Sequence, residues 1–225
     1  MKKNRGFTLI EMAITLLIVA LLLGGLIVPL STQVEQRKIT ETQKALDEIK
    51  EALVGFTLAN GRLPRPAISK TDGNEKLVCA DDLACTGFIP WATLGTPKLD
   101  AWGKIFVYSV SPAFANNPIT LTTTSTKTVQ TRNAAGTLSS LAASTPAVIL
   151  SQGKNNWGMG DNGNAFVDTS ATNNDEDTNN SGNVTFISRS QSDNTTAPGG
   201  EFDDLVTWLS PNILLNRMVA AGKLP

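Results

Sequence analysis

Glu11 is the first residue whose type and place indicate chemistry, because it is the only charge within an apolar run. The run extends from Phe7 to Val28. A helix needs about 20 apolar residues to cross a bilayer, and this run is long enough. An isolated ionised carboxylate is costly within a membrane. We therefore expect Glu11 to have a partner or a function that compensates for this cost.

The residues around the run predict its orientation. Three basic residues precede Gly6, namely Lys2, Lys3 and Arg5. By the positive-inside rule, this basic head keeps the N-terminus in the cytoplasm and places the rest of the chain outside. A secretory signal would have a shorter apolar core followed by small residues, whereas Pro29 and polar residues follow here. An ordinary signal anchor remains an alternative, but it does not explain Gly6, Phe7 and Glu11.

Residues 5–11, with the sequence RGFTLIE, resemble the signal of type IV pilins and type II secretion pseudopilins. The resemblance implies that a prepilin peptidase cuts between Gly6 and Phe7 and methylates the new N-terminal Phe7. Glycine suits a cleavage site because it has no Cβ. Glu11 follows Phe7 by four residues and shares its helical face. The resemblance implies that Glu11 pairs with the N-terminal amine of a neighbouring subunit.

Composition argues against an enzyme or a nucleic-acid-binding protein. The chain has 225 residues, a formal net charge of −1 and no histidine. No basic patch follows the first five residues, so nucleic acid is not an expected partner. The absence of histidine removes the commonest general base and metal ligand. No lysine- or carboxylate-based catalytic constellation is evident, so we expect no catalytic residues and no required cofactor.

The helical pattern indicates one long helix with two halves. Leu46 and Leu53 belong to an apolar stripe that recurs every seven residues, and Asn60-Gly61 ends the pattern. Gly24–Pro29 predicts a kink or a melted turn. We expect four segments: a leader at 1–6, a transmembrane and filament-core helix at 7–30, the amphipathic half of the same helix at 31–59, and a globular domain at 60–225.

The rest of the sequence predicts an α+β fold with a mostly antiparallel sheet and long loops. Strands are expected at 104–110, 147–151 and 184–188, and a final helix is expected after Ser210-Pro211. Within the Thr-, Ser- and Ala-rich stretch 118–145, the loose alternation of Ile119–Arg132 predicts a hairpin, and an exposed insertion is the alternative. Together with the N-terminal resemblance, this pattern predicts a pilin-like fold.

Two further features predict local sites. Cys79 and Cys85 are expected to form a disulfide in an oxidising periplasm. The loop 153–182 contains acidic residues without a local Lys or Arg after Lys154, which suits either a calcium site or a solvated acidic loop. Major pseudopilins hold calcium in a C-terminal loop, so the resemblance supports the ion, while a solvated acidic loop stays the preferred interpretation. The candidate calcium ligands are Asp161, Asp168, Asp175 and Asp177.

The expected function is structural. The resemblance implies a subunit in the bacterial inner membrane with a periplasmic domain, which assembles with other pilin subunits through an inner-membrane platform. In the turn 100–103, Asp100 is expected to cap the turn, Trp102 to fill the core and Gly103 to adopt a positive φ. The turn partly resembles one in the major pseudopilin, which favours a type II secretion pseudopilus over a type IV pilus. A membrane-anchored periplasmic binding module with a prepilin-like anchor is the alternative of a different class.

Overall fold

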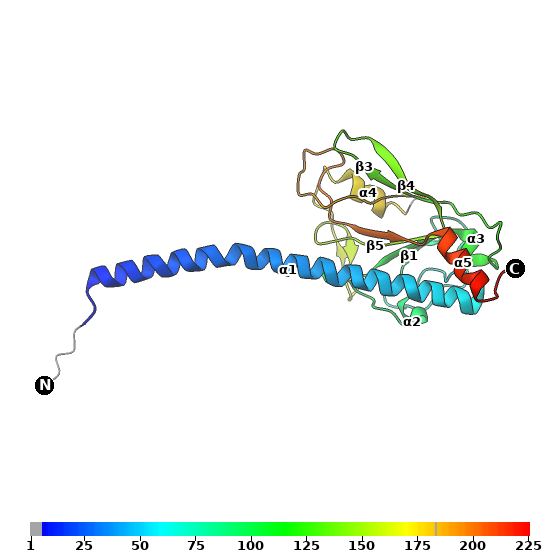
Figure 1. Cartoon of the computed structure of the whole chain (residues 1–225), viewed down its shortest axis with the longest axis horizontal. Helices are drawn as coiled ribbons and strands as arrows, with labels where there is room; N and C mark the ends of the chain where they lie inside the picture. The colour runs from blue at the N-terminus through cyan, green and yellow to red at the C-terminus, as the bar shows by residue number, and fades with distance from the viewer. Residues whose placement is uncertain (1–5, 183) are drawn as a thin grey trace. The chain divides into compact units, whose positions relative to one another are not determined.

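The structure is a computed structural model that describes residues 6–182 and 184–225, except for the side chains of 23–29. The basic head at 1–5 lies outside these residues. The chain divides into an N-terminal unit, Met1–Thr40, and a globular unit, Glu41–Pro225. Helix α1 (Leu9–Asn60) contributes residues to both units and is coloured from blue to cyan in Figure 1.

Helix α1 is uninterrupted over its 52 residues. It is also helical across Gly24–Pro29, so the expected melted turn is absent from the described backbone. Gly61 ends the helix with a φ of 72° and donates its backbone N–H to Thr57 O at 2.8 Å. Glycine adopts this left-handed conformation without the steric cost of a Cβ.

The apolar part of α1 leaves its described side chains exposed. Leu9 and Leu21 expose 93% and 69% of their surface. Among the described residues, no helix is long and apolar enough to span a membrane. The predicted membrane segment 7–30 includes residues 23–29, whose side chains lie outside the description. That segment stays a prediction.

A four-stranded antiparallel sheet organises the globular unit, with the strand order β1-β2-β5-β9. The strands are β1 (Thr86–Phe88), β2 (Val107–Val110), β5 (Ala147–Ser151) and β9 (Leu205–Trp208). Every residue of β5 is buried, which explains why its sequence is a short apolar run without alternation. The fold class α+β with antiparallel sheets is thereby confirmed.

The C-terminal part of α1 and helix α5 (Pro211–Ala220) cover one face of this sheet (Figure 1). The predicted stripe supplies Leu46, Ile49 and Leu53 to the core, and α5 adds Leu214 and Met218. Burying apolar surface contributes about 25 cal/mol per Å². This shared core fixes the helices on the sheet.

A second sheet packs on the other face, with the order β4-β3-β8. Strands β3 (Lys127–Arg132) and β4 (Leu138–Thr145) are antiparallel and form a hairpin that turns after Arg132, not within Ile119–Arg132 as expected. Strand β8 (Thr185–Ile187) pairs with β3 in parallel, unlike the other ladders. Val129 and Phe186 meet Val148 and Leu150 of β5 in a second core.

Short elements fill the remaining connections. Helices α2 (Trp91–Leu94) and α3 (Pro112–Asn116) both contribute apolar side chains to the core that the first sheet shares with α1 and α5. The expected acidic loop instead contains the hairpin β6 (Gly158–Met159) and β7 (Ala165–Phe166), followed by helix α4 (Asn174–Asn180). Cys79 and Cys85 form a buried disulfide with a Cα–Cα distance of 4.9 Å.

The turn 100–103 has the expected structural role with one difference. The Asp100 carboxylate accepts hydrogen bonds from the backbone N–H groups of Trp102 and Lys104, each at 2.9 Å, and from Ser151 Oγ at 2.6 Å. Gly103 has a φ of 82°. Trp102 is only half-buried, so it does not fill the core as such a turn predicts. Asp100 therefore holds this turn together.

Candidate functional site

The N-terminal segment is the first candidate site, and its predicted cleavage residues lie just before α1. Gly6 and Phe7 precede the helix without regular structure, and both are exposed. A Cβ built on Gly6 would meet no atom within 4 Å, and Gly6 has no positive φ. Neither packing nor backbone conformation therefore requires glycine at this position.

Thr8 and Glu11 form a reciprocal cap at the start of α1. The Glu11 carboxylate accepts hydrogen bonds from Thr8 N at 2.9 Å and Thr8 Oγ1 at 2.8 Å. In return, Glu11 N donates to Thr8 Oγ1 at 3.3 Å. This arrangement is a capping box, which satisfies donors that the first helical turn would leave unpaired. It also fixes Glu11 one turn below Phe7.

Thr8 is a residue that the sequence analysis missed. Its signal was present, since Thr-x-x-Glu before an apolar run is the sequence pattern of a capping box. Within the described residues, both hydrogen-bond donors to the Glu11 carboxylate belong to Thr8. The carboxylate is thus held in place by a neutral residue and can still accept a cation.

The four predicted calcium ligands do not gather in one place among the described residues. Asp161 pairs with Lys98 Nζ at 2.6 Å. Asp168 accepts hydrogen bonds from Ser170 N and Asn173 Nδ2.

The two aspartates on α4 also have separate partners. Asp177 accepts a hydrogen bond from Trp157 Nε1 at 2.8 Å. Asp175 is fully buried between two arginines, with Arg132 Nη2 at 2.7 Å and Arg189 Nε at 2.8 Å. The loop lacks local cations, but the fold brings Lys98, Arg132 and Arg189 to it from elsewhere in the chain.

A different set of carboxylates does meet. Oxygen atoms of Glu176, Asp203 and Asp204 all lie within 4.8 Å of one another. Glu176 comes from α4, and the two aspartates come from the turn before β9. Among the described residues, this is the group that could hold a metal ion. Sequence analysis did not single out Asp203 and Asp204, because 27 positions of sequence separate Asp203 from Glu176.

The group lies close to the buried ammonium of Lys104. That side chain is 1% exposed, and its Nζ donates to Gln152 O at 2.8 Å and Asn155 O at 2.5 Å. Burial lowers the pKa of Lys104, while the carboxylates Asp203 and Asp204 oppose this shift. The lysine therefore supplies positive charge near the acidic group without a direct ion pair.

Burial also raises the pKa values of Asp203 and Asp204. It raises the pKa of Asp203 to about 6, against hydrogen bonds from Asn155 N and Lys154 N that favour the ionised form. Burial raises the pKa of Asp204 well above its ordinary value, and the Asn179 side chain opposes the shift. Asp203 Oδ1 is buried and has no hydrogen-bond partner among the described residues. The pair thus favours a bound proton or a bound cation.

Comparison with known proteins identifies the N-terminal segment. Residues 1–27 match the family model described as the prokaryotic N-terminal methylation motif. The comparisons with curated proteins and with solved structures found no match. The match includes Gly6, Phe7 and Glu11, and it implies processing by prepilin peptidase and assembly with other pilin subunits. The chain therefore carries a prepilin-type N-terminal methylation motif, which supports a type IV pilin-like or pseudopilin-like protein.

Proposed function

We propose that the chain is a structural subunit of a type II secretion pseudopilus or a type IV pilus-like filament. Prepilin peptidase cuts it between Gly6 and Phe7 and methylates Phe7, and the mature chain joins other pilin or pseudopilin subunits. The observation that carries the proposal is the methylation motif at residues 1–27, with Glu11 four residues after Phe7. The motif points to a structural pilin-type protein, a class that is generally not enzymatic.

Charge gives the assembly step its physical basis. Cleavage creates an amine at Phe7, and the Glu11 carboxylate of a neighbouring subunit is its proposed partner. Either charge alone is costly in an apolar environment, whereas a hydrogen-bonded pair offsets much of that cost. Thr8 already fixes the carboxylate at the helix start. The pair therefore selects the axial register in which one subunit docks on the next.

The apolar side chains of the N-terminal unit supply most of the surface for the proposed contact between subunits. Described residues such as Leu9, Leu16 and Leu21 expose more than half of their surface. Large exposed apolar surfaces mark sites that bind a membrane or another protein. We propose that this surface lies in the inner membrane before assembly and in the filament core afterwards. The assembly platform of that membrane would transfer it between the two.

The same motif orients the subunit. The basic residues 2, 3 and 5 would hold the N-terminus in the cytoplasm, and the globular unit would face the periplasm. The Asp-x-Trp-Gly turn at 100–103 favours the pseudopilus over the type IV pilus. The presence of a secretion ATPase gene rather than a pilus-retraction ATPase gene beside the coding gene would support that placement.

Replacing Glu11 with alanine tests the assembly step. We expect Glu11→Ala to be inserted and cleaved normally but to be nearly absent from filaments, as measured by immunoblotting of sheared filaments against the membrane fraction. Glu48→Ala is the matched control, because Glu48 is an exposed carboxylate on the same helix. Normal incorporation of Glu11→Ala would contradict the proposed role of Glu11 in assembly. Absence of the unchanged protein from filaments would favour a membrane-anchored binding module.

We also propose that a structural calcium ion binds at Glu176, Asp203 and Asp204 rather than at the four aspartates expected from the sequence. Carboxylate oxygens are the ligands that calcium prefers, and these three meet while the other four are dispersed. Calcium should raise the melting temperature of the protein, and Glu176→Gln should abolish the increase. Asp161→Asn should leave the increase unchanged. A melting temperature unaffected by calcium and by chelator would contradict this site.

A further inference from the structure

The two sheets of the globular unit each end in a strand with an unpaired outer edge. Strand β9 is the last strand of one sheet, and β4 is the outer strand of the other. An open edge presents a row of backbone N–H and C=O groups that can pair with a strand of another chain. Proteins usually block such edges with charges, prolines or covering segments.

The hydrogen-bond pattern shows which groups of β9 point outward. Leu209 N donates to Ala147 O on β5 at 3.0 Å. In an antiparallel ladder, residues alternate between facing the partner and facing away. Thr207 therefore faces β5, whereas Val206 and Trp208 direct their N–H and C=O groups away from it. Among the described residues, these outward backbone groups have no recorded partner outside the sheet.

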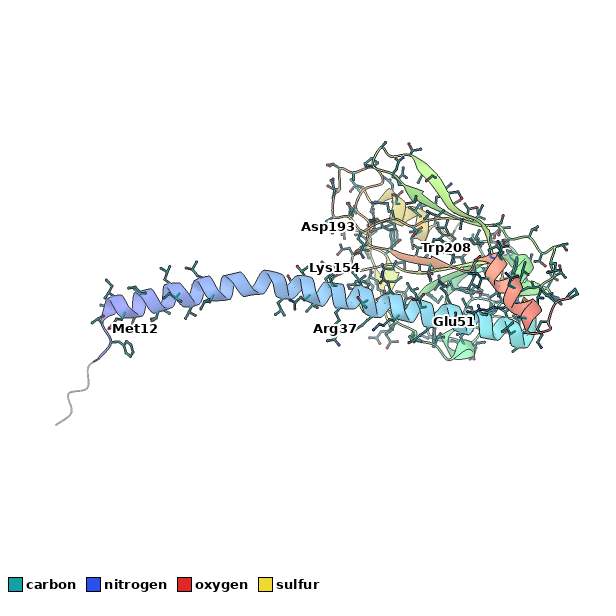
Figure 2. All side chains as sticks on the ribbon, in the orientation of Figure 1. Met12, Arg37, Glu51, Lys154, Asp193 and Trp208 are labelled. Carbon is teal, nitrogen blue, oxygen red and sulfur yellow. A yellow bond between two sulfur atoms is a disulfide. The ribbon has the colours of Figure 1, made fainter. Side chains whose placement is uncertain are left out.

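A groove of about 590 Å³ lies along this edge and is bounded by α1 and α5. Figure 2 labels Glu51 and Trp208, which both line it. The charges at its rim already have partners, since Arg217 Nη1 pairs with Glu51 Oε2 at 2.6 Å. Apolar side chains line its interior, among them Ile213, which is 58% exposed. The groove therefore suits an extended segment without charge.

Strand β4 has the properties of such a segment. No charged residue occurs between Arg132 and Lys154, and all but two residues of β4 are exposed. Its Leu138 and Leu141 expose 40% and 49% of their surface. An edge of this length normally carries a lysine or another charge that prevents pairing, and here it carries none.

The outward groups of β4 follow from the same alternation. Gln130 O on β3 accepts the backbone N–H of Ser188 at 2.8 Å, so Gln130 faces β8. Its partner across the β3–β4 ladder is Ser140. Ser140 and Leu138 therefore direct their N–H and C=O groups away from β3. Both edges thus present two outward-facing residues with the same spacing.

We propose that the outer edge of β4 in one copy of this chain pairs with the outer edge of β9 in a second copy. The choice of a second copy rests on the proposed filament, in which copies lie next to one another. An uncharged strand complements a groove whose rim charges are already paired. Because the two edges differ, the contact is heterologous and does not close on itself, so repetition extends it into an open chain.

Cysteine cross-linking of the full chain in detergent micelles tests the pairing. Directly opposite residues of antiparallel strands have Cα atoms about 4.5–5.5 Å apart, which lies within the Cα–Cα range of disulfides. Chains with Leu138→Cys or Ser140→Cys are each mixed with chains carrying Val206→Cys or Trp208→Cys. We expect a disulfide-linked dimer in at least one mixture and not from the single variants alone. Cys79 and Cys85 are already paired with each other.

Asp193→Cys is the matched control, because Asp193 is exposed and lies on neither edge (Figure 2). Mixed with Trp208→Cys, it should give no dimer. The mixture that gives the most dimer is then modified at the other outward residue of β4, which is Ser140 beside Leu138→Cys and Leu138 beside Ser140→Cys. That residue is changed to Pro in the test variant and to Ala in the matched control. Proline removes an outward N–H without breaking the β3–β4 ladder and should lower the dimer yield by about tenfold. Alanine keeps the N–H and should leave the yield unchanged.

The outcomes of this experiment distinguish the strand-pairing proposal from the proposal that the chain is a filament subunit. No dimer in any mixture of folded chains, at the highest concentration reached, would overturn the strand pairing even if Glu11→Ala abolishes filaments. A dimer that is insensitive to proline would also overturn it. A specific, proline-sensitive dimer would support it, even if the chain is not processed at Phe7 and the filament proposal fails.

Discussion

Glu11 of the N-terminal unit and Asp175 of the globular unit show two different uses of an acidic side chain. Asp175 is fully buried, and two arginines of the same unit neutralise it. Glu11 is exposed and is held by the neutral Thr8. Two arginines of the fold neutralise Asp175, whereas Glu11 caps the start of α1 and no cation neutralises it among the described residues. A charge that no described cation neutralises is the better candidate for contact with another molecule.

The same difference applies to the apolar residues of α1. Leu53 is buried in the core of the globular unit, while Leu9 in the N-terminal unit is 93% exposed. The comparison predicts a separation of effects. Changes in the globular unit should alter its free energy of unfolding but not cleavage after Gly6. Changes at the N-terminus should alter cleavage but not the free energy of unfolding.

The largest effect on stability is expected at Asp175. Replacing it with alanine leaves Arg132 and Arg189 without their shared counter-charge. Loss of one partner of a buried charge pair typically costs about 3–5 kcal/mol. The free energy of unfolding, measured by urea denaturation in micelles, should fall by this amount. Asp193→Ala, at an exposed site, should change it by less than about 0.5 kcal/mol. Equal effects of the two variants would contradict the buried network.

A core truncation should have the next largest effect. Leu53→Ala removes a fully buried side chain and should cost about 2–5 kcal/mol. Leu77→Ala is its matched control, because Leu77 is 92% exposed. Cleavage after Gly6 should proceed normally in both variants whenever the chain reaches the membrane. A cleavage defect in folded Leu53→Ala would show that the two units are not independent in this respect.

The pH dependence tests the acidic group around Glu176. Burial raises the pKa of Asp203 to about 6 in the folded state, above its unfolded value of 3.8. Between these values the folded state binds more protons, so this group's contribution to stability falls as pH rises from about 4 to 6. Asp203→Asn removes that dependence. We compare the free energy of unfolding of Asp203→Asn with that of the unchanged protein in the absence of calcium. The difference, variant minus unchanged protein, should increase by about 2 kcal/mol from pH 4 to pH 7. A relative stability independent of pH would contradict the shift.

The smallest effect is expected at the exposed ion pair between Glu51 and Arg217. Both side chains are about half exposed or more, with 65% and 47% of their surface accessible. Such pairs contribute about 0–1 kcal/mol, and salt weakens them. A double-mutant cycle of Glu51→Ala and Arg217→Ala should give a coupling free energy below about 0.5 kcal/mol. A larger coupling would show that this pair anchors α5.

Sequence analysis succeeded where the information is local. The run around Gly6, Phe7 and Glu11 is contiguous, and the family comparison matched it without any knowledge of the fold. The stripe of α1 and the buried strand β5 also follow from short patterns. The capping role of Thr8 was equally readable, because its partner is three residues away.

The acidic region could not be predicted in the same way. Arg132 reaches Asp175 across 43 positions of sequence, and Glu176 accepts the backbone N–H of Asp203 across 27. A search for neighbouring cations in the sequence finds none, yet the fold supplies them. The parallel pairing of β8 with β3 is equally non-local, since short strands carry no signal of their partner.

The central claim is that the N-terminal segment is processed as a prepilin. Intact-mass spectrometry of the chain purified from cells that contain the peptidase tests it directly. We predict a mature chain that starts at Phe7 and carries one added methyl group, and an unprocessed chain for a variant with Gly6→Leu. A chain that keeps residues 1–6 in the presence of active peptidase would contradict the account.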